Sequence, residues 1–170
     1  MSPVIQTYTG RAFPISDPKA SDVCIADIAA ALSKQCRFTG HTKRFYSVAE
    51  HCVNVSLVVP KNMALAGLLH DASEAYVTDI SSPLKSLLPE YKAIEKRVQQ
   101  AIFDCYGLEF PYQQEVKDAD EACLIAERNE LLGPCPFEWQ VKAEPATIFV
   151  VGLPPSDAER LFLNRFAELS

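Results

Sequence analysis

Apolar residues recur every three or four positions along much of the chain, the spacing that turns one face of a helix toward a core. In the first such stretch Ile25, Ile28 and Leu32 would share one face. Runs of this kind are typical of a mainly α-helical protein. The pattern predicts helices over residues 22–37, 45–59, 62–75, 90–106 and 112–132, and a last helix that begins with a capping box at Ser156.

Two short segments have the composition of β-structure instead. Residues 4–14 are rich in β-branched and aromatic residues around one glycine, which predicts a hairpin. Residues 147–151 form a strand candidate that could pair with it. Residues 133–145 hold three prolines and the only tryptophan, without a helical period, and indicate an ordered loop. The expected fold is a helical bundle with a small peripheral hairpin or sheet.

The composition fits one globular domain over residues 1–170 and argues against several partners. Of these residues 48% are hydrophobic and 22% are charged, enough apolar surface for one substantial core. A net charge of −6 without a block of Lys and Arg predicts no nucleic-acid binding. The longest purely apolar run, residues 63–69, is too short for a bilayer, and the N-terminus lacks a signal-peptide pattern. We expect no membrane association and a cytoplasmic location, in the host cytoplasm if a phage encodes the protein.

Six cysteines occur without a close pair of the zinc-knuckle or redox type, and several, including Cys105, lie on apolar stripes. An even number would permit disulfides in a secreted protein. Without a signal peptide we expect reduced, buried thiols.

The chemically richest stretch follows the apolar run of the third helix. His70, Asp71 and Glu74 project from one side of a helix at 100° per residue, and Asp79 follows shortly after. Two carboxylates and an imidazole beside leucines are costly to bury unless a cation or hydrogen-bond partners compensate them. The stretch therefore predicts a metal site.

Two further polar residues fall on apolar stripes. His51 lies one turn after Val48, and Asp120 lies four residues from both Val116 and Leu124. Each alone is compatible with a satisfied core residue. Together with the His70-Asp71 pair they supply two imidazoles and two carboxylates on three inner helices, a set able to surround one divalent cation.

Residues 37–46 connect the first two helices and contain Arg37, His41, two further basic residues and three aromatics. Such a loop suits contacts with phosphates and bases. The alternative is a solvated loop whose aromatic residues pack on the core.

Three segments together resemble the HD superfamily of metal-dependent phosphohydrolases. They are Tyr46-Ser-Val-Ala-Glu-His51, Leu68-Leu-His-Asp-Ala-Ser-Glu-Ala-Tyr76 with Asp79, and Val116-Lys-Asp-Ala-Asp120. The similarity covers roughly residues 20–132. It is greatest to bacterial 5′-deoxynucleotidases and to small phage HD phosphohydrolases, which include dATP triphosphohydrolases. The resemblance implies an HD-domain helical bundle.

The resemblance also implies roles for individual residues. One divalent transition metal (zinc, cobalt, manganese or iron) would be held by His51, His70, Asp71 and Asp120. Glu74 and Asp79 match acids beside the metal and the scissile phosphate. The substrate-binding residues would be Arg37, Phe38, Lys85 and Lys117, with which we group His41.

The function expected from this resemblance is hydrolysis at the α-phosphate of a purine dNTP such as dATP, giving a deoxynucleoside and triphosphate. Magnesium could accompany the triphosphate. A 5′-deoxynucleotidase acting on dNMPs and a catalytically inactive nucleotide-binding protein are the alternatives. We expect a deoxynucleotide as the small-molecule partner and a homo-oligomer, either a dimer or a larger ring.

Overall fold

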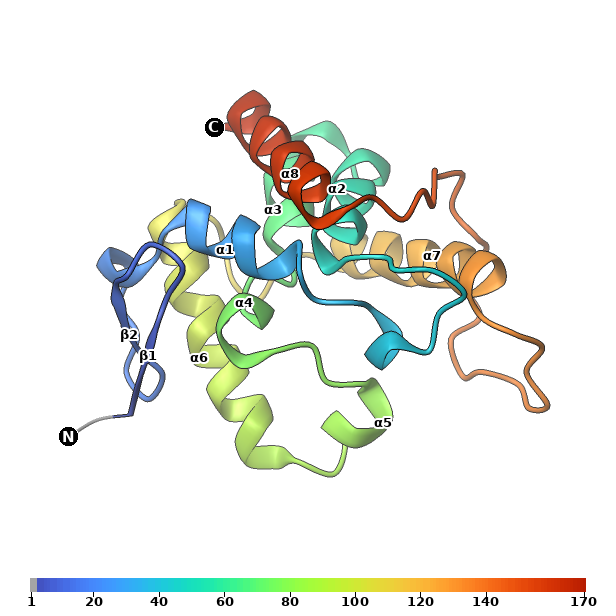
Figure 1. Cartoon of the computed structure of the whole chain (residues 1–170), viewed down its shortest axis with the longest axis horizontal. Helices are drawn as coiled ribbons and strands as arrows, with labels where there is room; N and C mark the ends of the chain where they lie inside the picture. The colour runs from blue at the N-terminus through green and yellow to red at the C-terminus, as the bar shows by residue number, and fades with distance from the viewer. Residues whose placement is uncertain (1–2) are drawn as a thin grey trace.

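The computed structural model describes residues 3–170, and more of these residues are in helices than in any other structure (Figure 1). The expected mainly α-helical fold with one small antiparallel hairpin is confirmed. Short 3-10 turns precede several of the helices. The α-helices are α1 Ile25–Leu32, α2 Val48–Val58, α3 Ala64–Leu69, α4 Glu74–Val77, α5 Ser82–Lys85, α6 Pro89–Cys105, α7 Gln114–Leu131 and α8 Pro155–Leu169.

Helix α2 lies at the centre of the packing. It contacts α3, α7, α8 and α1, and α8 also lies across α1 and α3. Every residue from Val48 to Ser56 is buried, so polar side chains on α2 cannot turn to solvent. Buried polar groups need hydrogen-bond or ionic partners. Glu50, His51 and Asn54 must therefore find such partners on other parts of the chain.

The hairpin predicted for residues 4–14 is present. Strand β1 Val4–Gln6 pairs antiparallel with β2 Ala12–Pro14, with Ile5 opposite Phe13. The fully buried ring of Phe13 stacks on Tyr76 of α4, with their ring centroids 3.7 Å apart. Thr9 at the turn donates from its backbone N–H to Asp27 of α1 across 2.7 Å. The hairpin is therefore tied to the helical core rather than to a larger sheet.

The single helix predicted for residues 62–75 is wrong. Helix α3 ends at Leu69, a tight turn covers residues 70–73, and α4 starts at Glu74. Gln99 of α6 stabilises this break, because its Nε2 donates to the Leu69 carbonyl at 2.7 Å and its Oε1 accepts from Ser73 N–H at 3.0 Å. Apolar periodicity continues through such a turn and cannot reveal it. The break places His70 and Asp71 at a helix end.

The strand predicted for residues 147–151 is also wrong. The segment is extended, but its backbone pairs with side chains of α2 instead of the hairpin: Asn54 donates from Nδ2 to the Phe149 carbonyl at 3.0 Å. The carboxylate of Glu50 accepts from N–H groups of Val151, Gly152 and Leu153 at 2.8–3.0 Å. A buried acid thus holds the chain that leads into α8.

Two local details differ from the sequence expectation. Helix α8 begins at Pro155 behind Pro154 and has no side-chain cap, so the capping box at Ser156 is wrong. All six cysteines are free thiols, but only Cys52 and Cys123 are buried, and Cys105 is exposed.

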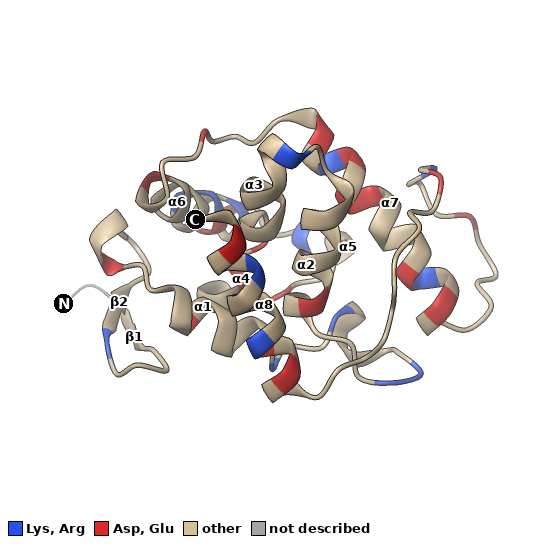
Figure 2. Ribbon diagram, turned by 90° about the horizontal axis from the view of Figure 1, so that it is seen from above, with Lys and Arg blue, Asp and Glu red and all other residues tan. Residues whose placement is uncertain are grey.

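Figure 2 shows acidic and basic positions interspersed along the helices, in keeping with the moderate negative charge of −6. In the described part of the chain, no helix combines the length and the apolar character needed to cross a bilayer.

Candidate metal centre

Three elements far apart in sequence bring their side chains to one point. His51 comes from the middle of α2, His70 from the first position after α3, and Asp120 from α7. Their nearest ligand atoms all lie within 4.8 Å of one another. His51 and His70 are buried and Asp120 is partly exposed, so the cluster sits at the edge of the core. These three residues could hold a metal ion.

The distances within the cluster fit coordination of one small cation. The two Nε2 atoms of His51 and His70 are 3.3 Å apart, and Asp120 Oδ1 lies 3.1 Å from the first and 3.8 Å from the second. Asp71 Oδ2 lies 3.2 Å from His70 Nε2 and 3.7 Å from His51 Nε2. Ligand atoms about 2.1 Å from a shared ion stand about 3.0–3.4 Å apart. The separations of 3.1–3.3 Å match this spacing, and those of 3.7 and 3.8 Å are longer, so Asp71 lies beside the three-residue cluster and next to His70.

The hydrogen-bond partner of Nδ1 in each histidine shows that Nε2 is the nitrogen that faces the cluster. His51 Nδ1 lies 2.7 Å from Glu127 Oε1, and His70 Nδ1 lies 2.8 Å from the Gly67 carbonyl oxygen. Both partners are acceptors, so we infer that each Nδ1 carries the proton and donates it. The two Nε2 lone pairs of the neutral rings then converge with carboxylate oxygens. That arrangement needs a cation or additional protons.

The ionisation of these groups agrees with a site built for positive charge. Burial alone lowers the pKa of His70, but the charges and hydrogen bonds of Asp71 and Asp120 outweigh it and raise the pKa well above its usual value. Burial raises the pKa of Asp71, but His70 outweighs it and brings the pKa to about 2. The pKa of Asp120 is lowered by the two histidines, again against burial. The carboxylates stay ionised and the imidazoles attract protons when no metal is bound.

Glu127 is a member of this site that the sequence prediction missed. It is fully buried, and its Oε1 also accepts from the hydroxyl of Tyr46 at 2.8 Å. Its Oε2 forms an ion pair with Arg37 Nε at 2.9 Å. Burial raises the pKa of Glu127, but Arg37 and His51 outweigh it, so the pKa is lowered. The signal was available, because Glu127 lies two helical turns after Asp120 on the same buried stripe.

Glu74 and Asp79 lie close to the cluster in a different environment. Within residues 3–170 Glu74 Oε2 is buried without a hydrogen-bond partner. Burial first, and then the charges of Asp71 and Asp79, raise the pKa of Glu74 well above its usual range. Burial also raises the pKa of Asp79, although Arg37 opposes it. Glu74 can therefore keep a proton in a place where Asp71 and Asp120 cannot.

Gln35 orders this acidic segment, and the sequence prediction did not single it out. Its Nε2 donates to the Glu74 carbonyl at 2.9 Å, and its Oε1 accepts from Asp79 N–H at 3.0 Å. A lone glutamine in a polar turn carries no periodic signal. Only the tertiary fold brings it across 39 residues to α4.

The expected substrate-binding residues divide into two groups. Arg37 is buried, with Nη1 3.8 Å from Asp71 Oδ2, and Lys85 Nζ lies 3.9 Å from Glu74 Oε1 and 2.6 Å from Glu95 Oε1. Arg37 therefore lies at the cluster, and Lys85 lies beside Glu74. His41 and Lys117 are exposed, and Lys117 makes its ionic contact with Glu121 of the same helix at 3.8 Å.

Phe38, the remaining residue of that set, lies beside Arg37, whose guanidinium carbon is 5.4 Å from its ring centroid. Its ring centroid is 6.4 Å from that of Trp139 in the loop after α7. The contact joins the residue after Arg37 to a loop that the sequence alone could not place.

Comparison with known proteins identifies relatives along nearly the whole chain. No family model matches the sequence. The uncharacterized protein RCAP_rcc00048 of Rhodobacter capsulatus is 29% identical, over 92% of this chain and 90% of its own length. The uncharacterized protein YfdR of Escherichia coli K12 is 42% identical, over 98% of this chain and 95% of its own length. The chain therefore belongs to the same protein family as YfdR of Escherichia coli.

Proposed function

We propose that the protein is a metal-dependent phosphohydrolase of the HD superfamily that cleaves 2′-deoxynucleotides at the α-phosphate. The observation that carries this proposal is the convergence of His51 and His70 with Asp71 and Asp120, beside a buried arginine and a protonatable glutamate. Such a combination of cation ligands, phosphate donor and proton carrier is what phosphoester hydrolysis requires.

The ligand set suits a divalent transition metal. Two imidazoles and two carboxylates accept zinc, cobalt, manganese or iron, and the three shortest donor separations, 3.1–3.3 Å, support binding of one such ion. A metal bound there would polarise a phosphoryl oxygen and bring the pKa of a coordinated water near neutrality.

Arg37 is the residue best placed to hold the phosphate. Its Nε forms an ion pair with Glu127 Oε2 at 2.9 Å, and its Nη1 lies 3.8 Å from Asp71 Oδ2 beside the cluster. A guanidinium held on one edge presents its remaining N–H groups in a fixed fork that matches phosphate oxygens. Lys85 adds a second positive charge near Glu74.

Glu74 would carry the proton for the leaving group. Burial, with the charges of Asp71 and Asp79, raises the pKa of Glu74 well above its usual range and so favours the protonated form, and a protonated acid can donate to the departing 5′ oxygen. Asp79, held by Gln35, would keep the pKa of Glu74 high through its negative charge.

The first candidate substrate is a purine dNTP such as dATP, with magnesium on the triphosphate, as the sequence resemblance implies. A second candidate, a 5′-deoxynucleotidase acting on dNMPs, is favoured by one observation. Arg37 lies at the cluster and Lys85 lies between Glu74 and Glu95, whereas Lys117 is exposed on α7. Two cations match the smaller charge of a monophosphate. From the same resemblance we also propose a cytoplasmic homo-oligomer, a dimer or a larger ring.

Product analysis tests the proposal. Purified protein is incubated with dNMPs and dNTPs in the presence of manganese, cobalt, zinc, iron or magnesium. Deoxynucleoside plus triphosphate identifies the first candidate, and deoxynucleoside plus phosphate from dNMPs identifies the second. Metal and nucleotide binding without turnover under all of these conditions would show a nucleotide-binding protein instead. Asp71→Ala should abolish turnover, and Asp118→Ala, an exposed aspartate on α7, should preserve it.

A further inference from the structure

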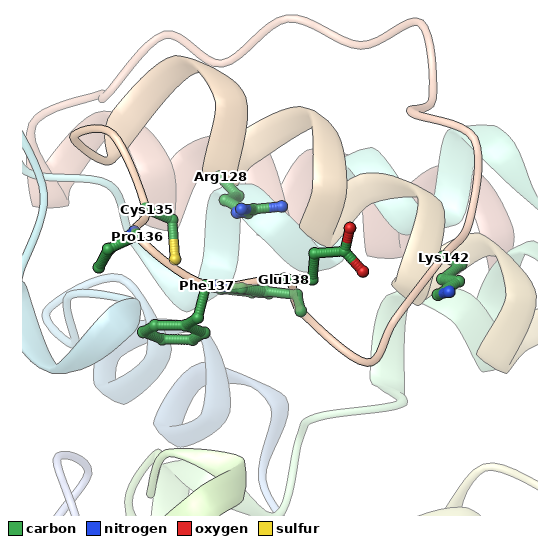
Figure 3. Close-up of a pocket in the computed structure, with 7 residues that line it drawn as sticks. Arg128, Cys135, Pro136, Phe137, Glu138 and Lys142 are labelled. Carbon is green, nitrogen blue, oxygen red and sulfur yellow. The ribbon is translucent and has the colours of Figure 1, made fainter.

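The loop after α7 surrounds an open pocket of about 620 Å³ that none of the metal-cluster residues lines (Figure 3). Its volume falls within the range of small-molecule sites, about 300–1,000 Å³. Arg128 enters it from α7, and the loop supplies the other side chains. The lining residues are Arg128, Cys135, Pro136, Phe137, Glu138, Trp139 and Lys142.

Two flat side chains dominate the pocket. The guanidinium carbon of Arg128 lies 4.6 Å from the ring centroid of Trp139, and Phe137 is 67% exposed at the rim. Indole and guanidinium planes are the surfaces on which nucleic-acid bases stack, and this stacking tolerates any base. The pocket therefore has the surface chemistry of an aromatic-ring site.

The charged side chains of the pocket supply hydrogen-bond donors and an acceptor for the edge of a base, and their positive excess also attracts a nucleotide toward the site. Arg128 and Lys142 supply two positive charges against the one negative charge of Glu138, on a chain whose net charge is −6. Local positive charge on an acidic protein raises the concentration of anions near it. Glu138 in turn offers oxygens that accept from an exocyclic amino group.

The pocket lies at a suitable distance from the metal cluster. Asp120 and Arg128 are eight residues apart on α7, a separation of roughly 12 Å along the helix axis at 1.5 Å per residue. This is comparable to the length of a nucleoside 5′-phosphate. Phe38 bridges the two places, because it follows Arg37 in the sequence and contacts Trp139.

The backbone beside the pocket is strained in a way that fits this bridging role. Phe38 and Thr39 have φ angles of 55° and 54°, a left-handed conformation that residues other than glycine rarely adopt. Lys43 ties the same loop to the end of α7, with its backbone N–H donating to the Leu131 carbonyl at 2.9 Å. Strained residues held by their surroundings concentrate at ligand clamps.

We propose that the pocket formed by Arg128 and Trp139 is the subsite for the base of a deoxynucleotide, an inference that rests on the proposed function. With the phosphate at Arg37 and the metal cluster, the nucleoside extends along α7. The Arg128 guanidinium covers one face of the Trp139 indole, so the base stacks on the outer face of this pair, and Glu138 and Lys142 reach the base edge.

Trp139 makes a direct test possible because it is the only tryptophan in the chain. Its fluorescence is recorded in EDTA, which prevents turnover, during titration with dAMP and dATP. The matched probe is 2-deoxyribose 5-phosphate, which has the sugar and phosphate but no base. Saturable quenching by the nucleotides and none by the probe is expected. Arg128→Ala should weaken nucleotide binding at least about fivefold, whereas Arg160→Ala, on exposed α8 surface, should leave it unchanged.

The outcomes separate this inference from the proposed function. Equal quenching by 2-deoxyribose 5-phosphate, an unchanged affinity in Arg128→Ala, or no quenching by any nucleotide at millimolar concentration would overturn the base subsite. If the nucleotides quench as expected but no metal supports hydrolysis, the subsite stands and the hydrolase proposal fails. If hydrolysis occurs but no nucleotide quenches the Trp139 fluorescence, the hydrolase proposal stands and the base subsite fails.

Discussion

The Nδ1 atom of His51 lies 2.7 Å from Oε1 of Glu127, in a part of the core without solvent exposure. A buried carboxylate at this distance fixes the ring orientation and keeps the proton on Nδ1, so that Nε2 faces Asp120 and His70. The other oxygen of Glu127 pairs with Arg37. One acid thus positions both a metal-ligand candidate and the candidate phosphate-binding residue.

Glu127→Gln should therefore lower metal affinity about 10- to 100-fold, the usual effect of removing a carboxylate behind a ligating histidine. Isothermal titration with manganese or zinc measures it. Glu130→Gln, on the same helix but exposed and paired with Arg44, is the control and should bind like the wild type. An unchanged affinity in Glu127→Gln would show that this carboxylate has only a structural role, and thermal unfolding of both variants reports any loss of stability separately.

The pKa shifts predict opposite pH dependences for the metal-free and the metal-bound protein. The pKa values of His51 and His70 are raised above 6.5 despite burial, so the protons they bind stabilise the metal-free fold fully below about pH 6.5. That stabilisation is lost as the pH rises through the folded-state values. Metal binding requires neutral imidazoles and strengthens over the same range. The increase in Tm on adding manganese should therefore grow as the pH rises above about 6.5, and a larger increase at acidic pH would contradict the assignment.

The two expected phosphate-binding lysines should behave differently in activity measurements. Lys85 lies 3.9 Å from Glu74, whereas Lys117 is exposed and pairs with Glu121. Lys85→Ala should reduce kcat/KM by about tenfold or more, because a charge near the reacting phosphate is removed. Lys117→Ala should change it less than about twofold on a dNMP. A large loss in Lys117→Ala with a dNTP would show that the triphosphate reaches this helix and would favour the triphosphohydrolase.

The segment held by Glu50 gives a prediction about stability alone. Gly152 has a φ of +82°, and a Cβ atom there would lie 2.6 Å from the Phe45 carbonyl oxygen. Gly152→Ala should destabilise the fold by about 1–3 kcal/mol through strain and this contact. Gly133→Ala is the matched control, because its Cβ meets nothing within 4 Å. Denaturant unfolding measures the free energy of unfolding of both variants. Equal values for Gly152→Ala and Gly133→Ala would contradict the proposed strain at Gly152.

The metal-binding candidates could be predicted from the sequence because each is a polar residue in an apolar pattern. His51 and Asp120 interrupt helix stripes, and His70 and Asp71 follow a wholly apolar helix. Burial of such groups has a free-energy penalty that demands a compensating partner. The structure accordingly brings His51, His70 and Asp120 together.

Other features of the site depend on contacts that no local pattern encodes. Gln35 and Gln99 act on backbone groups 39 and 30 residues away, at α4 and α3. Gln99 stabilises the turn over residues 70–73, because it hydrogen-bonds to the Leu69 carbonyl and the Ser73 N–H at the two ends of the turn. Residues 147–151 have the composition of a strand, but the buried Glu50 and Asn54 offer closer partners than the hairpin. The β-propensity of residues 147–151 indicated an extended backbone, but it could not indicate which groups this backbone hydrogen-bonds to.

Metal stoichiometry tests the central claim most directly. The protein, Asp120→Ala and Asp118→Ala are loaded with manganese or zinc, dialysed, and measured by elemental analysis. Asp118 lies two residues from Asp120 on α7 but is exposed and bonded to Gln114. We predict about one ion per chain in the wild type and in Asp118→Ala, and almost none in Asp120→Ala. Wild-type metal content in Asp120→Ala would contradict the metal centre.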